Sequence, residues 1–336
     1  MQINYPFDFL PEPGSAREVA PGVLWVRMPL PFALDHINLW LLQDGSEWTV
    51  VDTGVALDGL KDCWRKLLSA YPLRRQIVTH WHPDHIGLSG WLKQETGAPL
   101  WITESEYLTS QMVYAQIGSF GMPPMVEMFR QHGLDAQRAE AMEKVNGTYQ
   151  RNCSPAPLSY RRMFDGERID VGGRTWRVIV GHGHSPEHAA LYCAELKVLI
   201  SGDMLLPRIT TNVSARPSNL DGNPLGLFLD SIARFEPLPQ DTLVLPSHGA
   251  PFMGLHDRVA ALRQHHQDRF AALLATIDHP MTAAELVPVL FSRPLDDAFQ
   301  VMFAMGETMA HLKYLEYSRQ IARVTSKDCI RFDKLP

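Results

Sequence analysis

Residues 79–85 read Thr-His-Trp-His-Pro-Asp-His and hold four residues in the pattern H-x-H-x-D-H: His80, His82, Asp84 and His85. The apolar run just before them predicts a short buried strand. Two histidines at i and i+2 where a strand runs out point to the same side, and the next two residues fall on the following loop and helical turn. Because neutral imidazole and carboxylate suit zinc, iron or manganese, the stretch predicts two neighbouring sets of metal ligands. The alternative is a solvated histidine-rich loop.

Around this stretch, β-type runs alternate with turn signals and then with helical patterns. Strands are predicted at 22–28, 37–43 and 47–54, and helices at 57–70 and 85–97. This alternation of strands and helices predicts a layered α/β architecture.

The second half of the chain adds a helical insertion, a second meander and a helical tail. Residues 104–160 carry Met and aromatic residues at helical spacing, and strand signals return between residues 166 and 203. After residue 255, three helical patterns and a final hairpin match a winged-helix layout, and Thr282 with Glu285 forms a capping box. We therefore predict a domain of residues 1–254 and a small winged-helix domain of residues 255–336.

Three further stretches place polar residues at or just after predicted strand ends: GHGHSPEH (181–188), SGDML (201–205) and LPSHG (245–249). Loops at one edge of a sheet sandwich can converge, so these stretches can supply the further metal ligands that the histidine run needs. Taken in order, Asp52 in VVDTG, the run at 80–85, His184, Asp203 and His248 resemble the motif pattern of the metallo-β-lactamase superfamily. The resemblance covers about residues 20–254 and implies an αββα sandwich.

The resemblance also implies a role for each residue of the pattern. The first metal would be held by His80, His82 and His184, the second by Asp84, His85 and His248, and Asp203 would bridge them. Asp52 would lie behind these ligands and orient the histidine loop. The two metals would most often be zinc, with iron or manganese as alternatives.

Some residues depart from the family pattern or leave a choice open. Glu187 stands where the family commonly has glycine, and His182 could compete with His184 from i−2. His188 is expected to be buried and hydrogen-bonded rather than a ligand. Asp203 replaces the cysteine of many secreted antibiotic-hydrolysing members, so we do not expect an antibiotic lactamase. The other histidines lack partner spacing and are expected to be surface or core residues: His36, His132, His256, His265, His266, His279 and His311.

Composition narrows the class of protein. The chain has 336 residues with 31 basic and 37 acidic side chains, which argues against a protein that coats nucleic acid or anionic membrane. The overall charge still allows a local basic groove on the surface. The four cysteines lie far apart, which favours a reducing compartment: Cys63, Cys153, Cys193 and Cys329. The amino terminus lacks leader features and no stretch is long and apolar enough for a membrane span, so we expect a cytoplasmic protein.

The predicted chemistry is hydrolysis. Two metals about 3.5–4 Å apart would share a hydroxide that attacks a carbonyl or phosphoryl centre, and Asp84 could orient it and later protonate the leaving group. Winged-helix-tailed members that the chain resembles include glyoxalase II-like hydrolases and a single-strand endoribonuclease. The first hypothesis is a hydrolase of a small thioester, ester or lactone. The alternative nuclease would need a basic channel, for which the candidates are Arg161, Arg162, Arg208 and Arg216.

A third hypothesis is a winged-helix binding protein with a vestigial metal site, which retention of all seven ligand positions argues against. We expect a small-molecule substrate, no DNA or membrane partner, and a homodimer as one possible assembly. The tail carries equal numbers of basic and acidic residues, unlike a DNA-reading surface. The insertion, including Met125 and Phe129, could form an acyl-binding lid or pack on the sandwich. The polar loop after Asp203 could contact substrate or simply connect: Arg208, Asn212, Arg216 and Asn219.

Overall fold

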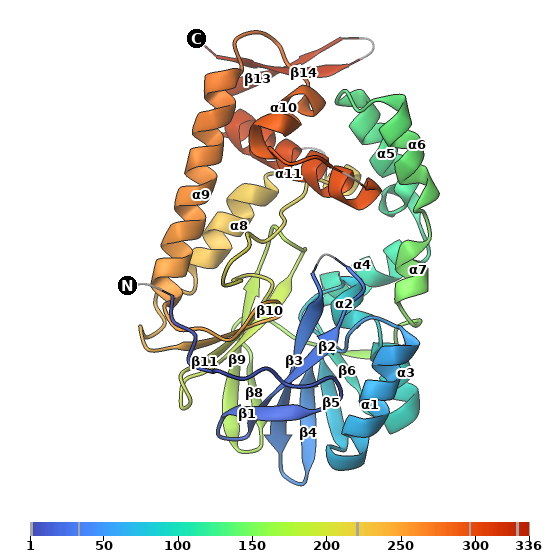
Figure 1. Cartoon of the computed structure of the whole chain (residues 1–336), viewed down its shortest axis with the longest axis vertical. Coiled ribbons are helices and arrows are strands. Elements are labelled where there is room, and N and C mark those ends of the chain that lie inside the picture. Colours follow the sequence, from blue (N-terminus) through green and yellow to red (C-terminus); the bar gives the residue numbers. More distant parts are fainter. Residues whose placement is uncertain (1–2, 33, 220–221, 296, 327–328, 336) are drawn as a thin grey trace. The chain divides into compact units, whose positions relative to one another are not determined.

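The computed structural model describes residues 3–32, 34–219, 222–295, 297–326 and 329–335. The chain forms two compact units that each collect several segments (Figure 1). The first unit contains Met1–Tyr114, Thr148–Thr211 and Ser231–Val259, and the second contains Ala115–Gly147, Asn212–Asp230 and Ala260–Pro336.

The first unit is built on two sheets. The larger sheet has seven strands that lie in chain order: β1 (Ala16–Ala20), β2 (Val23–Pro29), β3 (His36–Asp44), β4 (Glu47–Val51), β5 (Leu73–Ile77), β6 (Leu100–Ile102) and β7 (Tyr160–Arg162). Its first four strands form an antiparallel meander, and β4 to β7 run parallel. The second sheet has the order β12 (Leu243–Pro246), β11 (Val198–Gly202), β10 (His188–Cys193), β9 (Arg174–Gly181) and β8 (Arg168–Val171).

The core of this unit lies between the two sheets. One apolar cluster joins Trp25 and Trp40 of the larger sheet to Val178 and Leu191 of the second, and all four are almost fully buried. In each strand the inward residues alternate with residues of the opposite face, as the pleat requires. The two sheets pack face to face. This packing holds the loops of one sheet at a fixed distance from the loops of the other.

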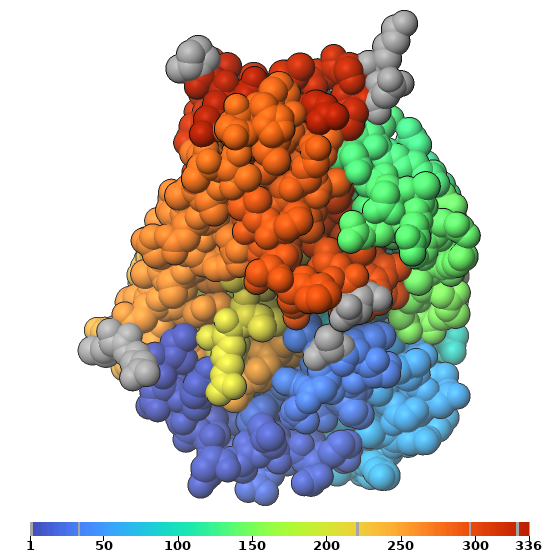
Figure 2. Space-filling view, turned by 45° about the horizontal axis from the view of Figure 1, so that its top comes forward, coloured from blue at the N-terminus to red at the C-terminus, as the bar shows by residue number. Residues whose placement is uncertain are grey.

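Helices cover the outer face of the larger sheet. The apolar side of α1 (Asp58–Ala70), with Trp64 and Leu67, shares a cluster with β2, β3 and β4, and Leu92 of α3 (Ser89–Thr96) joins it. Helix α1 lies beside the amino-terminal strands (Figure 1), and the blue atoms of this part of the chain lie together in the space-filling view (Figure 2). The predicted mixed α/β fold is therefore confirmed.

The helix predicted at 85–97 is wrong in one respect, because the chain forms two short helices there. α2 (Pro83–Ile86) ends before Gly87, and α3 begins at Ser89. A Cβ on Gly87 would lie 2.2 Å from the carbonyl oxygen of Pro83 and 2.7 Å from that of Gly54. Position 87 therefore accepts glycine, because a side chain there would clash with neighbouring backbone.

The second unit is mainly helical. It contains α5 (Met122–Gln131), α6 (Ala136–Lys144), most of α9 (Leu255–Thr276), α10 (Ala283–Leu290), α11 (Ala298–Tyr317) and the hairpin β13 (Ile321–Thr325) with β14 (Ile330–Lys334). The predicted capping box is confirmed, since Thr282 and Glu285 exchange both hydrogen bonds. The three helices and the hairpin of the tail occur as predicted. Their assignment to the winged-helix class stays a prediction, as does the domain boundary near residue 255.

The middle of the predicted insertion, residues 115–147, groups with this second unit. Phe129 of α5 is fully buried, and the N–H of Ala284 donates to the carbonyl oxygen of His132 at 3.1 Å. The His132 ring stacks on Phe332 with 6.1 Å between centroids. Phe129 is therefore a core residue and not an exposed surface for an acyl chain.

Helix α8 (Pro224–Ala233) runs from the second unit into the first. In the first unit, Ser231 Oγ accepts a hydrogen bond from the N–H of His182 at 2.8 Å, which fixes the end of β9. No helix in the part of the chain that the structure describes is both long and apolar enough to cross a membrane.

The second unit holds a carboxyl group whose ionisation affects stability. Burial raises the pKa of Glu307 to about 7, against a lowering contribution from its bond with Asn212. As pH rises from about 4.5 to 7, the unfolded chain loses this proton first, so the native state becomes less favoured. We expect Glu307→Gln to be more stable than the wild type by about 1–3 kcal/mol above pH 7, with the gain vanishing near pH 4. Urea unfolding at several pH values measures this, and a constant difference between variant and wild type would contradict it.

Candidate metal centre

The predicted ligands lie in the segments that follow four strand ends, five of them on loops and two, Asp84 and His85, in the short helix α2. They come after β5, which ends at Ile77, β9 at Gly181, β11 at Gly202 and β12 at Pro246. The structure brings all seven predicted ligand residues together in two groups. His80 and His82 lie beyond the strand, in the loop before α2, so strand alternation is not what makes them converge.

The first group contains His80, His82, His184 and Asp203, whose ligand atoms all lie within 4.8 Å of one another. His80 Nε2 is 2.8 Å from His82 Nδ1 and 3.1 Å from His184 Nε2. One nitrogen of each ring therefore faces a common point, as the ligands of a single cation must.

The second group contains Asp84, His85 and His248, again within 4.8 Å. Asp84 Oδ2 lies 3.3 Å from His248 Nε2 and 3.6 Å from His85 Nε2. Two imidazoles and one carboxylate thus form a second set beside the first.

Asp203 lies between the two groups. Its Oδ2 is 3.4 Å from His184 Nε2, and its Oδ1 is 3.6 Å from the Nε2 atoms of both His85 and His248. Each carboxylate oxygen therefore faces a different set, so one carboxylate can contact both sets at once.

Two buried polar atoms at the centre indicate a fit to cations. His85 Nε2 and Asp203 Oδ1 are buried and have no hydrogen-bond partner among the described residues. Buried polar atoms are nearly always paired, so unpaired ones that point into a ligand cluster indicate a binding site. Nitrogen and carboxylate donors suit divalent metals such as zinc, iron or manganese. The donor set therefore fits divalent ions and does not select one of them.

The ionisation of two residues in the first group supports this interpretation. Burial acts to raise the pKa of Asp203, but His85 and His248 outweigh it and hold that pKa well below its usual value. Burial and the neighbouring histidine His85 hold the pKa of His80 well below its usual value, which keeps that ring neutral. An ionised carboxylate and a neutral imidazole are the forms that bind metals.

Asp52 lies behind His85, as the resemblance implies. Its Oδ2 is 2.8 Å from His85 Nδ1, and its Oδ1 accepts the N–H of Thr79 at 2.7 Å. Asp52 adopts a left-handed backbone with φ of 63°, which is costly for a residue with a side chain. That backbone brings the carboxylate to the ring, so Asp52 fixes Nδ1 and leaves His85 Nε2 facing the ligand group.

His248 is held in a similar way by a residue that the sequence left without a role. Its Nδ1 donates to the carbonyl oxygen of His36 at 2.8 Å, and the N–H of Gly249 donates to His36 Nε2 at 2.9 Å. His36 therefore orients His248 from the start of β3. More than two hundred positions separate the pair in sequence, so no local pattern could reveal it.

His188 is a buried, hydrogen-bonded residue rather than a member of either group. Its Nε2 accepts the backbone N–H of Asp203 at 3.1 Å. Burial lowers the pKa of His188 to about 3, so the ring is neutral and can accept this bond. The His188 ring thereby fixes the backbone at Asp203, the residue between the two groups.

The choice between His182 and His184 has a geometric answer, because only His184 joins a ligand group. His182 Nδ1 lies 2.6 Å from the carbonyl oxygen of Pro186, so this ring is bound to its own loop. Glu187, which departs from the family glycine, accepts the N–H of Ser105 at 3.0 Å through Oε2. Its side chain thus ties the loop to the start of α4 (Glu104–Tyr114).

This geometry makes a prediction for the two histidines. We expect His184→Ala to lose about one metal equivalent and most activity, because it removes one of three imidazoles from the first group. His182→Ala should keep both metals. Metal analysis of the purified variants decides between them, and loss of metal in His182→Ala alone would reverse the assignment.

Glu106 is a buried residue of the site that sequence reasoning missed. Its Oε1 accepts from Ser185 Oγ at 2.7 Å and from the N–H of Glu187 at 2.6 Å, and its Oε2 accepts from the N–H of Trp81 at 2.9 Å. Burial raises its pKa. In sequence it is an ordinary acidic residue in the first turn of a helix, and nothing marks it as buried.

The polar loop after Asp203 is partly engaged within the protein. Arg208 Nε donates to Tyr5 Oη at 3.4 Å in the first unit. In the second unit, Asn212 Nδ2 donates to Glu307 at 3.2 Å, Arg216 is half-buried, and Asn219 is exposed in a short 3-10 helix.

Two packed sheets with a buried histidine and aspartate cluster at their loop edge define a metallo-hydrolase. The chain belongs to the metallo-beta-lactamase superfamily, whose family model matches residues 33–248. A second model, the metallo-beta-lactamase-like C-terminal domain, matches residues 270–335.

Relatives with solved structures share the whole fold. A beta-lactamase domain protein from Burkholderia ambifaria is 42% identical, with a TM-score of 0.91 over 99% of this chain and 98% of that chain. A metallo-beta-lactamase family protein from Thermus thermophilus is 30% identical, with a TM-score of 0.81 over 95% of this chain and 100% of that chain.

Two further relatives are similar at lower identity. A Bacillus subtilis protein named "Probable metallo-hydrolase YqjP" is 22% identical over 92% of this chain and 97% of its own length. An atrochrysone carboxyl ACP thioesterase of Aspergillus terreus is 23% identical over 89% of this chain and 81% of its own length. The chain is thus a hydrolase of this superfamily, and its substrate is a separate question.

Proposed function

We propose that this protein is a dinuclear metal-dependent hydrolase of a small thioester, ester or lactone. The observation that carries the proposal is the position of Asp203, whose two oxygens face separate ligand groups. A site for one metal ion would need only one of the two ligand groups. The second group, with its two imidazoles and one carboxylate, would then have no ion to hold.

Each residue group has a distinct role in this proposal. The first ion would be held by His80, His82 and His184, the second by Asp84, His85 and His248, and Asp203 would contact both. Zinc is the proposed metal, with iron or manganese as alternatives. When bound, a pair of such ions supplies an activated water at neutral pH and polarises the scissile carbonyl.

Asp84 is the proposed group for proton transfer. It lies at the start of α2, and its side chain is 20% exposed, so it can reach both the ligand group and an incoming substrate. Its carboxylate would orient the attacking water and then hold a proton for the leaving group. His85 and His248 fix its position on one side.

A thioester is the favoured substrate among the three classes. Several fungal relatives are named as thioesterases that act on an acyl carrier protein, and the A. terreus protein aligns with 89% of this chain. The cleavage of a thioester also needs least from the protein, because a thiolate is a good leaving group. For this chain we propose a small acyl thioester.

The nuclease alternative receives less support from the arginines that would form its basic channel. Arg161 pairs with Glu167, and Arg162 pairs with Glu104 at 2.8 Å. Ion-paired arginines offer a phosphate backbone less net charge.

A hydrolysis screen tests the proposal. Acyl thioesters, aryl esters, lactones and single-stranded RNA are offered to protein of measured metal content, with His82→Ala as the inactive control. We expect thioester cleavage that disappears in the control. RNA cleavage that also disappears in the control, without thioester cleavage, would reject the proposal in favour of the nuclease.

A further inference from the structure

We propose that Glu106 is a positioning residue that holds both loops of the first ligand group and so sets the affinity of the first metal position. This inference rests on the proposed dinuclear site. In this inference, one buried carboxylate affects the metal affinity of the first position and not that of the second, although Asp203 faces both.

The contacts of Glu106 all lie next to ligands of the first group. Trp81, whose N–H it accepts, stands between His80 and His82. Ser185, whose hydroxyl it accepts, directly follows His184. One side chain therefore connects the backbone at the two histidines of one loop to the loop that carries the third.

The second ligand group has different supports. Asp52 binds His85 through Nδ1, and His36 binds His248 through its carbonyl oxygen. Among the described residues, Glu106 makes no hydrogen bond to a residue of the second group. Loss of the Glu106 carboxylate should therefore loosen one metal position and leave the other in place.

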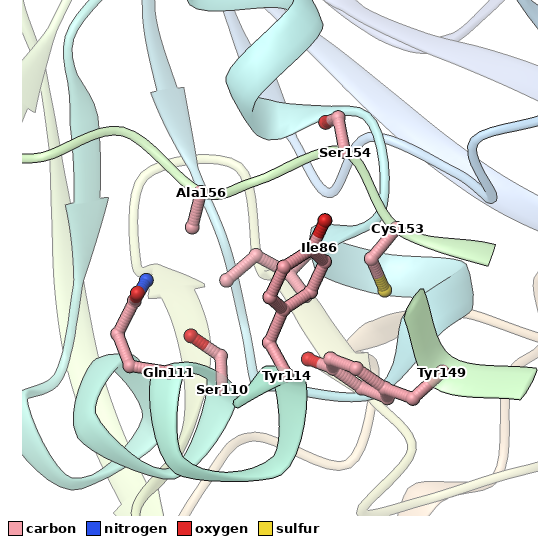
Figure 3. A pocket seen from close by; sticks show the side chains of 8 residues that line it. All are labelled: Ile86, Ser110, Gln111, Tyr114, Tyr149, Cys153, Ser154 and Ala156. Atoms are coloured by element: carbon pink, nitrogen blue, oxygen red, sulfur yellow. The ribbon is translucent and has the colours of Figure 1, made fainter. Parts of the chain in front are cut away.

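Trp81 is held from both sides, which makes its loop sensitive to these contacts. Tyr149 Oη donates to the carbonyl oxygen of Trp81 at 2.7 Å, and the two rings lie 5.6 Å apart. Tyr149 belongs to α7 (Thr148–Asn152) and lines a small hollow with Cys153, whose sulfur points toward it (Figure 3). The hollow has a volume of about 10 Å³, room for about one water molecule.

The carboxyl group of Glu106 is held by two backbone N–H groups and one hydroxyl. The side chain is completely buried, and in the part of the chain that the structure describes no lysine or arginine forms an ion pair with it. A buried carboxylate without a cation is costly, even with three hydrogen-bond donors. A divalent ion beside the loops that Glu106 holds would offset this cost, so the carboxylate and the ion stabilise one another.

Replacement by glutamine separates these contributions. A carboxylate accepts at both oxygens, and here it accepts from two loops at once. Glutamine keeps the size but offers one accepting oxygen, and its amide group would face a donor N–H. Glu106→Gln therefore releases one of the two loops and removes the charge, without opening a cavity.

The experiment compares Glu106→Gln with Glu104→Gln, a half-exposed carboxylate of the same helix that pairs with Arg162. Each metal-free protein is titrated with zinc in the presence of a competing chelator. We expect two sites in the wild type and in Glu104→Gln, and in Glu106→Gln one site unchanged and one weakened by about 10- to 100-fold. Tyr149→Phe should weaken the same site by less.

Thermal unfolding distinguishes positioning from a merely structural role. If Glu106 only stabilises the fold, Glu106→Gln lowers Tm equally with and without zinc, and both affinities stay at the wild-type value; that outcome overturns the inference. If Glu106 positions ligands, the increase in Tm on adding zinc becomes smaller. A wild-type protein that binds fewer than two ions would instead reject the dinuclear site itself.

Discussion

Replacing Asp203 with alanine is expected to lower kcat/KM by about 10³-fold or more. Asp203 is the residue whose oxygens face both ligand groups, at 3.4 Å from His184 and 3.6 Å from His85. In the proposed dinuclear site, its loss would remove a ligand from each metal position, together with a negative charge that balances the ions. A pair of metal ions stabilises the transition state by several kcal/mol. A loss of about 4 kcal/mol lowers the rate by three orders of magnitude. Kinetics on the substrate found by the screen measure the effect.

The matched control is Asp241→Ala, which removes an exposed aspartate that pairs with Lys197 on the surface. It should keep wild-type kcat/KM and metal content. Circular dichroism of Asp203→Ala should show an intact fold, since the change shortens a side chain at a loop. An Asp203→Ala protein with more than about a tenth of wild-type activity would show that no bridge is needed.

Gly202→Ala is expected to damage both stability and metal binding, although alanine adds a single carbon. Gly202 ends β11 with φ of 54°, a left-handed conformation that disfavours a side chain. An added Cβ would lie 2.3 Å from Nε2 of His188, the atom that accepts the N–H of Asp203. His188 is fully buried and cannot move aside. We expect a loss of about 2–4 kcal/mol in the free energy of unfolding, together with weaker metal binding.

Gly97→Ala separates backbone strain from the clash. Gly97 follows α3 with φ of 77°, and an added Cβ there would meet nothing within 4 Å. It should cost only about 1 kcal/mol and leave metal affinity unchanged. Urea unfolding and zinc titration of the two variants provide the comparison, and equal losses would show that strain alone explains Gly202→Ala.

The ligand residues could be predicted because they lie where short-range signals are strong. Strand patterns end just before His184, Asp203 and His248, and the ends of packed sheets meet at one edge. The order of histidine and aspartate in residues 80–85 also rarely arises by chance, so the pattern is easy to recognise. The local geometry was predicted less well, since His80 and His82 lie in a loop rather than at alternating strand positions.

The residues that support the ligands could not be predicted, because their contacts span long sequence distances. Glu106 meets Ser185 and Glu187, and His36 meets His248, through bonds that depend on how loops from both sheets come together. A single glutamate or histidine carries no pattern of its own. Its burial is visible only once the chain is folded.

The partner of the insertion's buried face could not be predicted, for a related reason. The apolar stripe through Phe129 correctly predicts a helix with one buried face, but it does not say which surface covers that face. In the structure, that helix groups with the carboxyl-terminal helices. Periodicity identifies that a face is buried, and only the tertiary structure identifies its partner.

The central claim is that two metal ions act together in one site. Its most direct test is a zinc titration of the metal-free protein in which bound metal and hydrolysis are followed in the same samples. The structure supplies a complete set of protein ligands for each ion, so we predict two equivalents bound, with activity reaching its maximum only as the second site fills. Full activity at one equivalent, with no further change on adding a second, would contradict the account.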